Sequence, residues 1–226
     1  MHLVFIPARS NSKGIPEKNI QLVGSMSLIE RAVNSAHDCS FDLRVVLAVD
    51  EGCCLDHAQQ LQASARYEHL EIFIRSAANA QDQSSTESVM AEYLSDEVLA
   101  ASETISLMQV TSPFTTPSTI EKCIRATEGN GLASLTVTRR HMFRWSSTGE
   151  PLNYEPAKRP RRQDWAGELS ETGAFYTTTP ILYKKSRVRI VGNCNLIEVD
   201  EVEGLEIDTG TDLAVCRAIE SLDKLR

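Results

Sequence analysis

Long hydrophobic runs are absent from this sequence of 226 residues. No stretch approaches the roughly 18 consecutive apolar residues that a transmembrane helix requires. The apolar amino terminus reaches Arg9 too soon to form the core of a secretory signal peptide. We therefore expect a cytoplasmic protein that does not associate with membranes.

Cysteine is scarce and scattered. The chain has 6 cysteines, of which only Cys53 and Cys54 are adjacent, and no pair has the C-x-x-C spacing of a metal or redox site. An isolated cysteine usually behaves as a small buried hydrophobe, so we expect reduced thiols, mostly in the core. A chain of this length can bury a core large enough to fold without disulfides or a structural metal.

Positive charge is in the minority. There are 23 Lys and Arg against 31 Asp and Glu, which gives a formal net charge of −8. The phosphates of nucleic acids and of anionic membranes would repel most of such a surface, so neither is an expected partner. Any site for an anionic ligand must be local.

Short apolar runs alternate along the chain with longer segments of helical period. This pattern is typical of a mostly parallel sheet flanked by helices, with right-handed crossovers between the strands. The sequence predicts an α/β fold, a three-layer α/β/α sandwich formed by one domain over residues 1–226. The expected strands are 3–6, 45–48, 72–74, 105–108 and 133–137, and helices are expected within 85–94, from Pro117, and after the turn at 209–212.

The alternation stops between about residues 139 and 172. This segment holds both tryptophans, three prolines and the run KRPRR at 158–162. A long irregular excursion in a compact domain is usually functional, as a lid, a binding arm or a subunit contact. Four cations in five residues need an anionic partner or open solvent, and by themselves would also suit a nuclear-localisation or nucleic-acid patch.

The first expected strand leads into a loop that carries three cations, Arg9, Lys13 and Lys18. Ligands of open α/β sheets bind at the carboxyl ends of the strands, where small residues let backbone amides approach a polyphosphate. The loop matches neither the P-loop nor the dinucleotide-binding pattern. It is predicted to bind a polyphosphate in another way, and a solvated basic loop is the alternative.

Carboxylates occur at two expected strand ends. Asp50 ends the second strand, and the alternation of Glu206 with Asp208 places both on one side of an extended chain. Such a pair suits a hard divalent cation that bridges substrate phosphates. Asp212 is more readily explained as a residue at a helix amino terminus. Gln109, in QVTSP, offers a donor and an acceptor to a base or a sugar, although a turn would look similar.

Together these segments resemble the acylneuraminate cytidylyltransferases, the CMP-sialic acid synthetases. IPARSNSKGIPEKNI is similar to the family's amino-terminal signature ARGGSKGIPxKN, and QVTSP is similar to its QxTSP. The segments RRHMFRW, PLNYEPAKRPRRQDWAGEL and GAFY look most like the catalytic domain of the animal-type enzyme. The resemblance covers residues 3 to about 220. It implies a Rossmann-like nucleotidyltransferase fold and a homodimer in which the long arm reaches the neighbouring subunit.

The resemblance also implies roles for individual residues. Nucleotide-binding residues would be Arg9, Lys13, Lys18, Asn19, Arg75, Ser84, Thr86 and Gln109, and sugar-binding residues would be Gln109, Arg144, Arg161 and Tyr176. Arg161, Arg9 and Lys18 would be catalytic, and Mg²⁺ would be held by Asp208, with Glu206 and Asp50 as further groups. The sequence departs from the family pattern at Ser10 and Asn11, at Glu206, and at Thr172, where the usual Asn lies near the sugar.

The implied reaction transfers CMP from CTP to the anomeric hydroxyl of N-acetylneuraminate or a related nonulosonic acid, and releases pyrophosphate. Deaminoneuraminate, legionaminate and 3-deoxy-octulosonate are alternative sugars. A non-catalytic nucleotide-binding protein is an alternative of another class. The proton of the sugar hydroxyl would pass either to a metal-bound hydroxide or, from a hydroxyl oriented by Gln109, to water.

Overall fold

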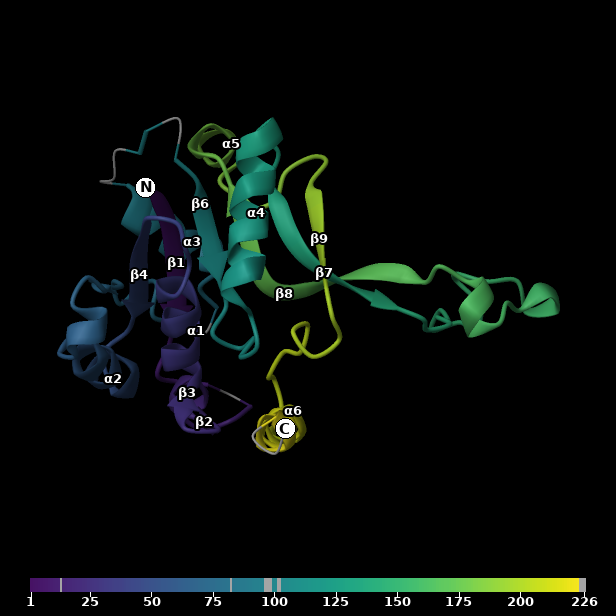
Figure 1. The fold of residues 1–226 in the computed structure, drawn as a ribbon, viewed down its shortest axis with the longest axis horizontal. Coiled ribbons are helices and arrows are strands. Elements are labelled where there is room, and N and C mark those ends of the chain that lie inside the picture. The colour runs from purple at the N-terminus through teal and green to yellow at the C-terminus, as the bar shows by residue number, and fades with distance from the viewer. Residues whose placement is uncertain (13, 82, 96–98, 101–102, 224–226) are drawn as a thin grey trace.

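A seven-stranded sheet forms the centre of the computed structural model, which describes residues 1–12, 14–81, 83–95, 99–100 and 103–223 (Figure 1). In spatial order its strands are β5 (Glu71–Ile74), β4 (Leu43–Val49), β1 (His2–Ala8), β6 (Ile105–Met108), β8 (Glu168–Thr178), β7 (Ser134–Arg140) and β9 (Asn195–Val199). Only β8 runs antiparallel to its neighbours in this sheet. The expected mostly parallel sheet is therefore confirmed.

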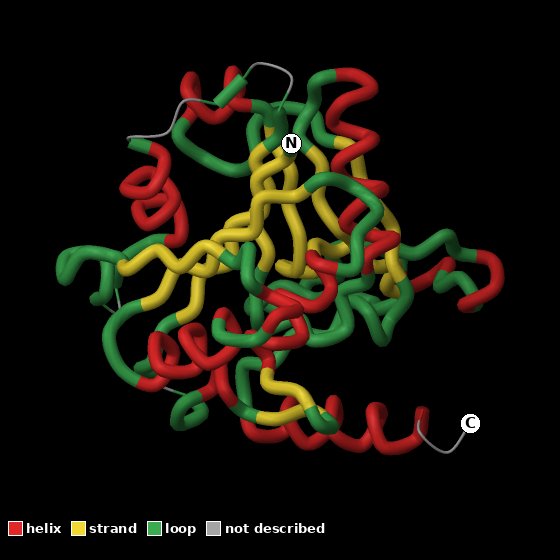
Figure 2. Tube along the Cα trace, turned by 60° about the vertical axis from the view of Figure 1, so that its left-hand side comes forward, coloured by secondary structure: helices red, strands yellow, loops and turns green. Residues whose placement is uncertain are grey.

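Helices cover both faces of the sheet (Figure 2). One face packs against α1 (Leu28–His37), α2 (Cys53–Gln62), α4 (Pro117–Asn130) and α6 (Gly210–Asp223), and the other against α3 (Thr86–Leu94) and α5 (Pro180–Ser186). Strand β1 contributes to both cores, because Val4 and Ile6 face one of them while Leu3 and Phe5 face the other. The predicted three-layer α/β/α sandwich is confirmed.

Local sequence signals fix where the helices begin and end. Helices α1, α3, α4 and α5 each start after a Ser or Thr whose hydroxyl accepts a backbone N–H three residues further on. Helix α4 has Pro117 in its first turn, as its sequence predicts, and ends at Gly131, which has a φ of 72°. A small second sheet of β2 (Leu22–Val23) and β3 (Met26–Ser27) precedes α1.

Two strands of the sheet, β8 and β9, were not among the expected ones. Strand β8 lies between β6 and β7, although its sequence is rich in threonine. Two of its buried hydroxyls have partners on the neighbouring strands: Thr177 pairs with Ser106 at 3.0 Å, and Thr172 pairs with Thr136 at 2.7 Å. The buried hydroxyl of Thr178 has no partner among the described residues. These hydrogen bonds make a polar sequence compatible with a central position.

The β7–β8 hairpin continues beyond the sheet as an arm formed by residues 141–167 (Figure 1). Strands β7 and β8 both extend into the segment that was expected to be irregular, at about 139–172. The arm therefore begins after Arg140 and ends before Glu168. Aromatic contacts hold it together: Phe143 stacks on Trp165 at 4.9 Å between ring centroids, and the Arg159 guanidinium lies 4.3 Å from the Phe143 centroid. The arm is therefore an ordered projection.

The cysteines are free thiols, and Cys54, Cys123 and Cys216 are buried. Burial raises the pKa of Cys54 and of Cys123 to about 12, so both are thiols at neutral pH. Half of the cysteines, rather than most of them, thus lie fully in the core. Within the described ranges, no helix combines the length and the apolar character needed to cross a membrane.

Candidate active site

A cavity of about 260 Å³ opens where β1 and β6 end. Its walls come from the loop after β1, the residues that follow β5 and β6, and the start of α3. Side chains that line it include Arg9, Ser12, Lys18, Asn19, Arg75, Gln81, Ser84, Thr86, Gln109 and Thr111. This is the carboxyl edge of the parallel strands, where open α/β sheets bind ligands. The structure thus gathers most residues of the predicted nucleotide site around one cavity.

The loop after β1 supplies cations and an unpaired acceptor. The Lys18 ammonium donates to the Ile207 carbonyl at 2.9 Å and to Asp208 Oδ1 at 3.2 Å, and its side chain is only 14% exposed. The Asn19 amide donates to the Arg9 carbonyl at 2.9 Å, whereas its buried Oδ1 has no partner among the described residues. A donor on a bound ligand would satisfy that oxygen. Lys13 lies outside the described residues.

Ser10 ties the same loop to the start of α2. Its backbone N–H donates to Asp50 Oδ1 at 2.7 Å, and its hydroxyl accepts the Cys54 N–H at 3.1 Å. The part of the chain that the structure describes has no group of three or more His, Cys, Asp or Glu side chains that could hold a metal, so Asp50 does not form a joint ligand set with Glu206 and Asp208. The Asp50 carboxylate instead holds the loop backbone, and its role as a further metal group stays a prediction.

The remaining nucleotide-site residues are fixed by backbone contacts. Gln109 follows β6, and its N–H donates to the Ala174 carbonyl at 2.9 Å. The Ser84 hydroxyl donates to the Ala78 carbonyl at 2.9 Å, and Thr86 begins α3. Arg75 is buried and donates to the carbonyls of Ala8 and Ala48, which joins the ends of β1 and β4 beneath the cavity. Burial lowers the pKa of Arg75.

Residues 206–208 contact Lys18 and Thr111, two residues of the cavity wall. The Ile207 N–H donates to the Thr111 carbonyl at 2.8 Å, and the Ile207 side chain is fully buried. Glu206 and Asp208 consequently face the other side together, as the alternation predicts. Glu206 as a whole is exposed, but its carboxylate accepts the Thr111 hydroxyl at 3.2 Å. Desolvation of this carboxyl group, and then the charge of Asp208, raise its pKa.

The raised pKa of Glu206 predicts a pH effect on stability. The folded protein binds this proton more tightly than the unfolded chain does, so stability falls as pH rises from the ordinary glutamate value through the raised one. Glu206→Gln removes this titration. We therefore expect its melting temperature, relative to wild type, to be higher at about pH 7 than at about pH 4.5 without divalent cations. The same difference at both pH values would contradict the shift.

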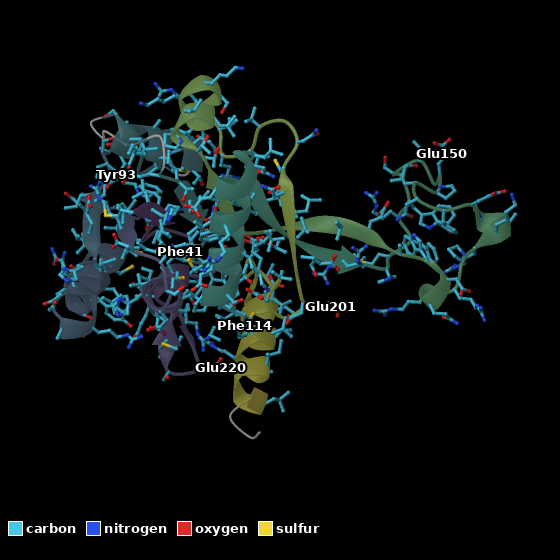
Figure 3. The ribbon with its side chains drawn as sticks, turned by 45° about the horizontal axis from the view of Figure 1, so that its top comes forward. Phe41, Tyr93, Phe114, Glu150, Glu201 and Glu220 are labelled. Carbon is cyan, nitrogen blue, oxygen red and sulfur yellow. The ribbon has the colours of Figure 1, made fainter. Side chains whose placement is uncertain are left out.

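Of the predicted sugar-binding residues, Gln109 lines the cavity of its own chain, whereas the others do not. Arg144 pairs with Glu168 at 2.9 Å and Arg161 pairs with Asp164 at 2.6 Å, both outside the cavity wall. Figure 3 shows the arm, with Glu150 toward its far end, extending away from Phe41 and Tyr93 in the body. Arg161 belongs to this arm, so it is distant from the cavity of its own chain.

Tyr176 is likewise separated from the cavity. Its side chain is only 3% exposed, its hydroxyl donates to Glu171 Oε1, and the Arg189 guanidinium lies 4.7 Å from its ring centroid. Thr172, at the position of the family's Asn, is buried with its hydroxyl bonded to Thr136. Thr172 therefore does not line the cavity of its own chain.

Two site residues were missed at the sequence level. Thr111 lines the cavity and holds both Glu206 and Ile207, and it stands within the QVTSP motif that could have pointed to it. Gly173 has a φ of +77°, and a Cβ there would lie 3.1 Å from Glu206 Oε2. A side chain at Gly173 would be strained and would crowd this carboxylate.

Comparisons with known proteins give consistent results. A model of a family described as cytidylyltransferase matches residues 3–206. N-acylneuraminate cytidylyltransferase A of Danio rerio is 30% identical over 219 residues, which cover 93% of this chain and 49% of that protein. CMP-N,N'-diacetyllegionaminic acid synthase of Legionella pneumophila is 28% identical over 60% of this chain and 57% of its own length. The chain thus spans about half the length of these curated relatives.

Solved structures share the fold. The structure of CMP:2-keto-3-deoxy-manno-octonic acid synthetase complexed with CTP superposes with a TM-score of 0.71 over 99% of this chain and 100% of that one, at 17% identity. At this level of identity the likeness establishes the architecture alone. It confirms the Rossmann-like nucleotidyltransferase fold that the motifs implied.

Proposed function

Since this chain belongs to the cytidylyltransferase family, we propose that it transfers CMP from CTP to the anomeric hydroxyl of a nonulosonic acid such as N-acetylneuraminate. The observation that carries the proposal is the cavity at the ends of β1 and β6, with Arg9, Lys18, Asn19 and Gln109 in its wall. The two cations suit the triphosphate. The unpaired amide oxygen of Asn19 suits a donor on the nucleoside, and the Gln109 amide suits the nucleoside or the sugar.

The reaction is an in-line displacement at the α-phosphorus of CTP. The anomeric oxygen forms a bond to phosphorus, the bond from phosphorus to the pyrophosphate oxygen breaks, and the hydroxyl proton passes to water. Chemistry of this kind depends mainly on positioning and charge neutralisation. Arg9 and Lys18 bind the phosphates and offset charge on the departing pyrophosphate, while Gln109 orients the cytidine or the sugar.

Asp208 and Glu206 suit Mg²⁺. Both offer hard oxygen donors beside the cavity, and the Asp208 side chain is 68% exposed and therefore accessible. Mg²⁺ usually takes only one or two carboxylates together with substrate phosphates and water, which fits two acidic residues without a third. When bound, the ion would neutralise phosphate charge. The protein's own part is to present Asp208 next to Lys18 at the edge of the cavity.

A second copy of the chain would complete the sugar side of the site. Arg144 and Arg161 do not line the cavity of their own chain, and the arm exposes Met142 at 63%, Trp145 at 53% and Leu152 at 57%. An exposed apolar surface of this kind favours a protein partner. In a two-fold dimer each arm would carry its arginines to the other subunit, where Arg161 would meet the sugar carboxylate or the triphosphate.

Pyrophosphate release tests the proposal. Purified protein is incubated with CTP, Mg²⁺ and, in turn, N-acetylneuraminate, deaminoneuraminate, legionaminate and 3-deoxy-octulosonate, with CTP alone as the control. Release with a nonulosonate is expected, and the sugar that is used identifies the substrate. Folded protein that binds CTP but releases no pyrophosphate with any of the four sugars would contradict the proposal and favour a nucleotide-binding protein without catalysis.

A further inference from the structure

Asp208 depends on its neighbours for its orientation. Its carboxylate pairs with Lys18, and its backbone follows Ile207, whose carbonyl accepts from the same ammonium. A Cβ on Gly14 would lie 2.6 Å from the Asp208 carbonyl oxygen, so the loop after β1 packs directly on this peptide. Small changes in the backbone at residue 208 would therefore move its carboxylate relative to Lys18 and the cavity.

Asp212 holds the other side of this backbone. Its Oδ2 atom accepts the Asp208 N–H at 3.1 Å, the Thr209 N–H at 2.8 Å and the Thr209 hydroxyl at 2.9 Å. The Asp212 N–H donates in return to the Thr209 hydroxyl at 3.3 Å. The Thr209–Asp212 contacts form a reciprocal cap at the start of α6, the type that a helix amino terminus requires.

One of these bonds lies outside the helix cap. A capping residue has no need of the N–H of Asp208, because that residue precedes the cap. By accepting it, Asp212 fixes the peptide that carries the Asp208 side chain. Asp208 is consequently held at its N–H by Asp212, its carbonyl oxygen lies against Gly14, and its carboxylate meets Lys18.

We propose that Asp212 is a positioning residue, which aims the Asp208 carboxylate at Lys18 and the nucleotide cavity without touching the substrate. This inference rests on the function proposed above. Residues that orient a metal-binding group commonly change activity or metal affinity by about 10-fold to 100-fold when they are replaced. Asp212 thus connects the start of α6 to the part of the site that the loop after β1 forms.

Replacement of Asp212 tests the inference. For Asp212→Ala we expect kcat to fall about 10-fold and the Mg²⁺ concentration for half-maximal rate to rise, with little change in the KM for the sugar. Asp212→Asn keeps an oxygen that can accept the same bonds, so it should restore kcat to within about 3-fold of wild type. Asp56→Ala is the matched control, because Asp56 is an exposed acid in the first turn of α2, away from the cavity wall.

A purely structural cap would give another result. The melting temperature of Asp212→Ala would then be a few degrees lower than that of wild type. Its kcat would equal that of Asp56→Ala at every Mg²⁺ concentration. This result would overturn the inference. If wild type releases no pyrophosphate, the proposed function fails, and the inference is tested by the rise in melting temperature with CTP and Mg²⁺. A smaller rise in melting temperature for Asp212→Ala than for Asp56→Ala supports the inference. Equal rises in the two variants, or no rise in wild type, overturn the inference.

Discussion

Lys18→Met should reduce kcat/KM for CTP at least about 100-fold. Methionine preserves much of the length of the side chain but removes its charge. The ammonium of Lys18 is largely shielded from solvent and joins Asp208 to the cavity. Its loss would remove the proposed phosphate contact and leave the Asp208 carboxylate without its cation. The effect should therefore exceed that of removing a surface charge.

Initial rates of pyrophosphate release over a range of CTP concentrations measure this effect. Lys122→Met, on the exposed face of α4, is the matched control and should keep nearly full activity. Circular dichroism establishes that both variants are folded. A Lys18→Met enzyme within about 3-fold of wild type would remove this lysine from the catalytic site.

Two inactive variants should restore activity when they share a dimer. Arg161→Ala disables the arm, whereas Lys18→Met disables the cavity, and each alone should retain less than about 1% of wild-type turnover. The ion pair of Arg161 with Asp164 is exposed, with 74% of the arginine side chain accessible, so it is weak and easily exchanged for an anionic ligand. If the arm acts on the other subunit, a mixed dimer has one site with an intact cavity and an intact arm.

Co-expression of the two variants measures this complementation. Random pairing gives about half mixed dimers with one working site each, so the mixture should reach about a quarter of wild-type activity. Lys18→Met paired with Asp208→Asn is the matched control, because both changes disable the cavity and no combination of subunits restores it. Activity no higher than the sum of the separate variants would show that the arm does not serve a neighbouring cavity.

The parts of the fold that the sequence predicted are those with strong local signals. Residues 3–6 in β1 form a continuous apolar run, and α4 has both its amino-terminal cap and its proline. Strand β8 could not be recognised in this way, because two of its buried threonines, Thr177 and Thr172, are paired with hydroxyls on β6 and β7. These partner residues are distant from β8 in sequence, so no local sequence pattern predicts the pairing.

The residues of the candidate site also fall into two groups, those that local sequence patterns predicted and those that depend on the folded structure. The cluster of Arg9, Lys18, Asn19 and Gln109 follows from the rule that parallel strands end at one edge, and the structure places these residues around one cavity. Asp50 ends a neighbouring strand too, but its carboxylate turns to the Ser10 backbone, which only the loop conformation decides. The burial of Tyr176 and the direction of the arm depend on the packing of segments that are distant in sequence, which no local pattern reveals.

The Lys18–Asp208 contact has a consequence for how the protein is made. Its two residues are separated by 190 positions, and Lys18 also bonds to the neighbouring Ile207 carbonyl. Pairings between distant positions form late in folding, because a long loop must close first. During synthesis, β1, β4 and β6 leave the ribosome well before the segment that closes the cavity edge. A growing chain should therefore complete its nucleotide pocket only after residues 207 and 208 have been synthesised, and shorter nascent chains should not bind CTP.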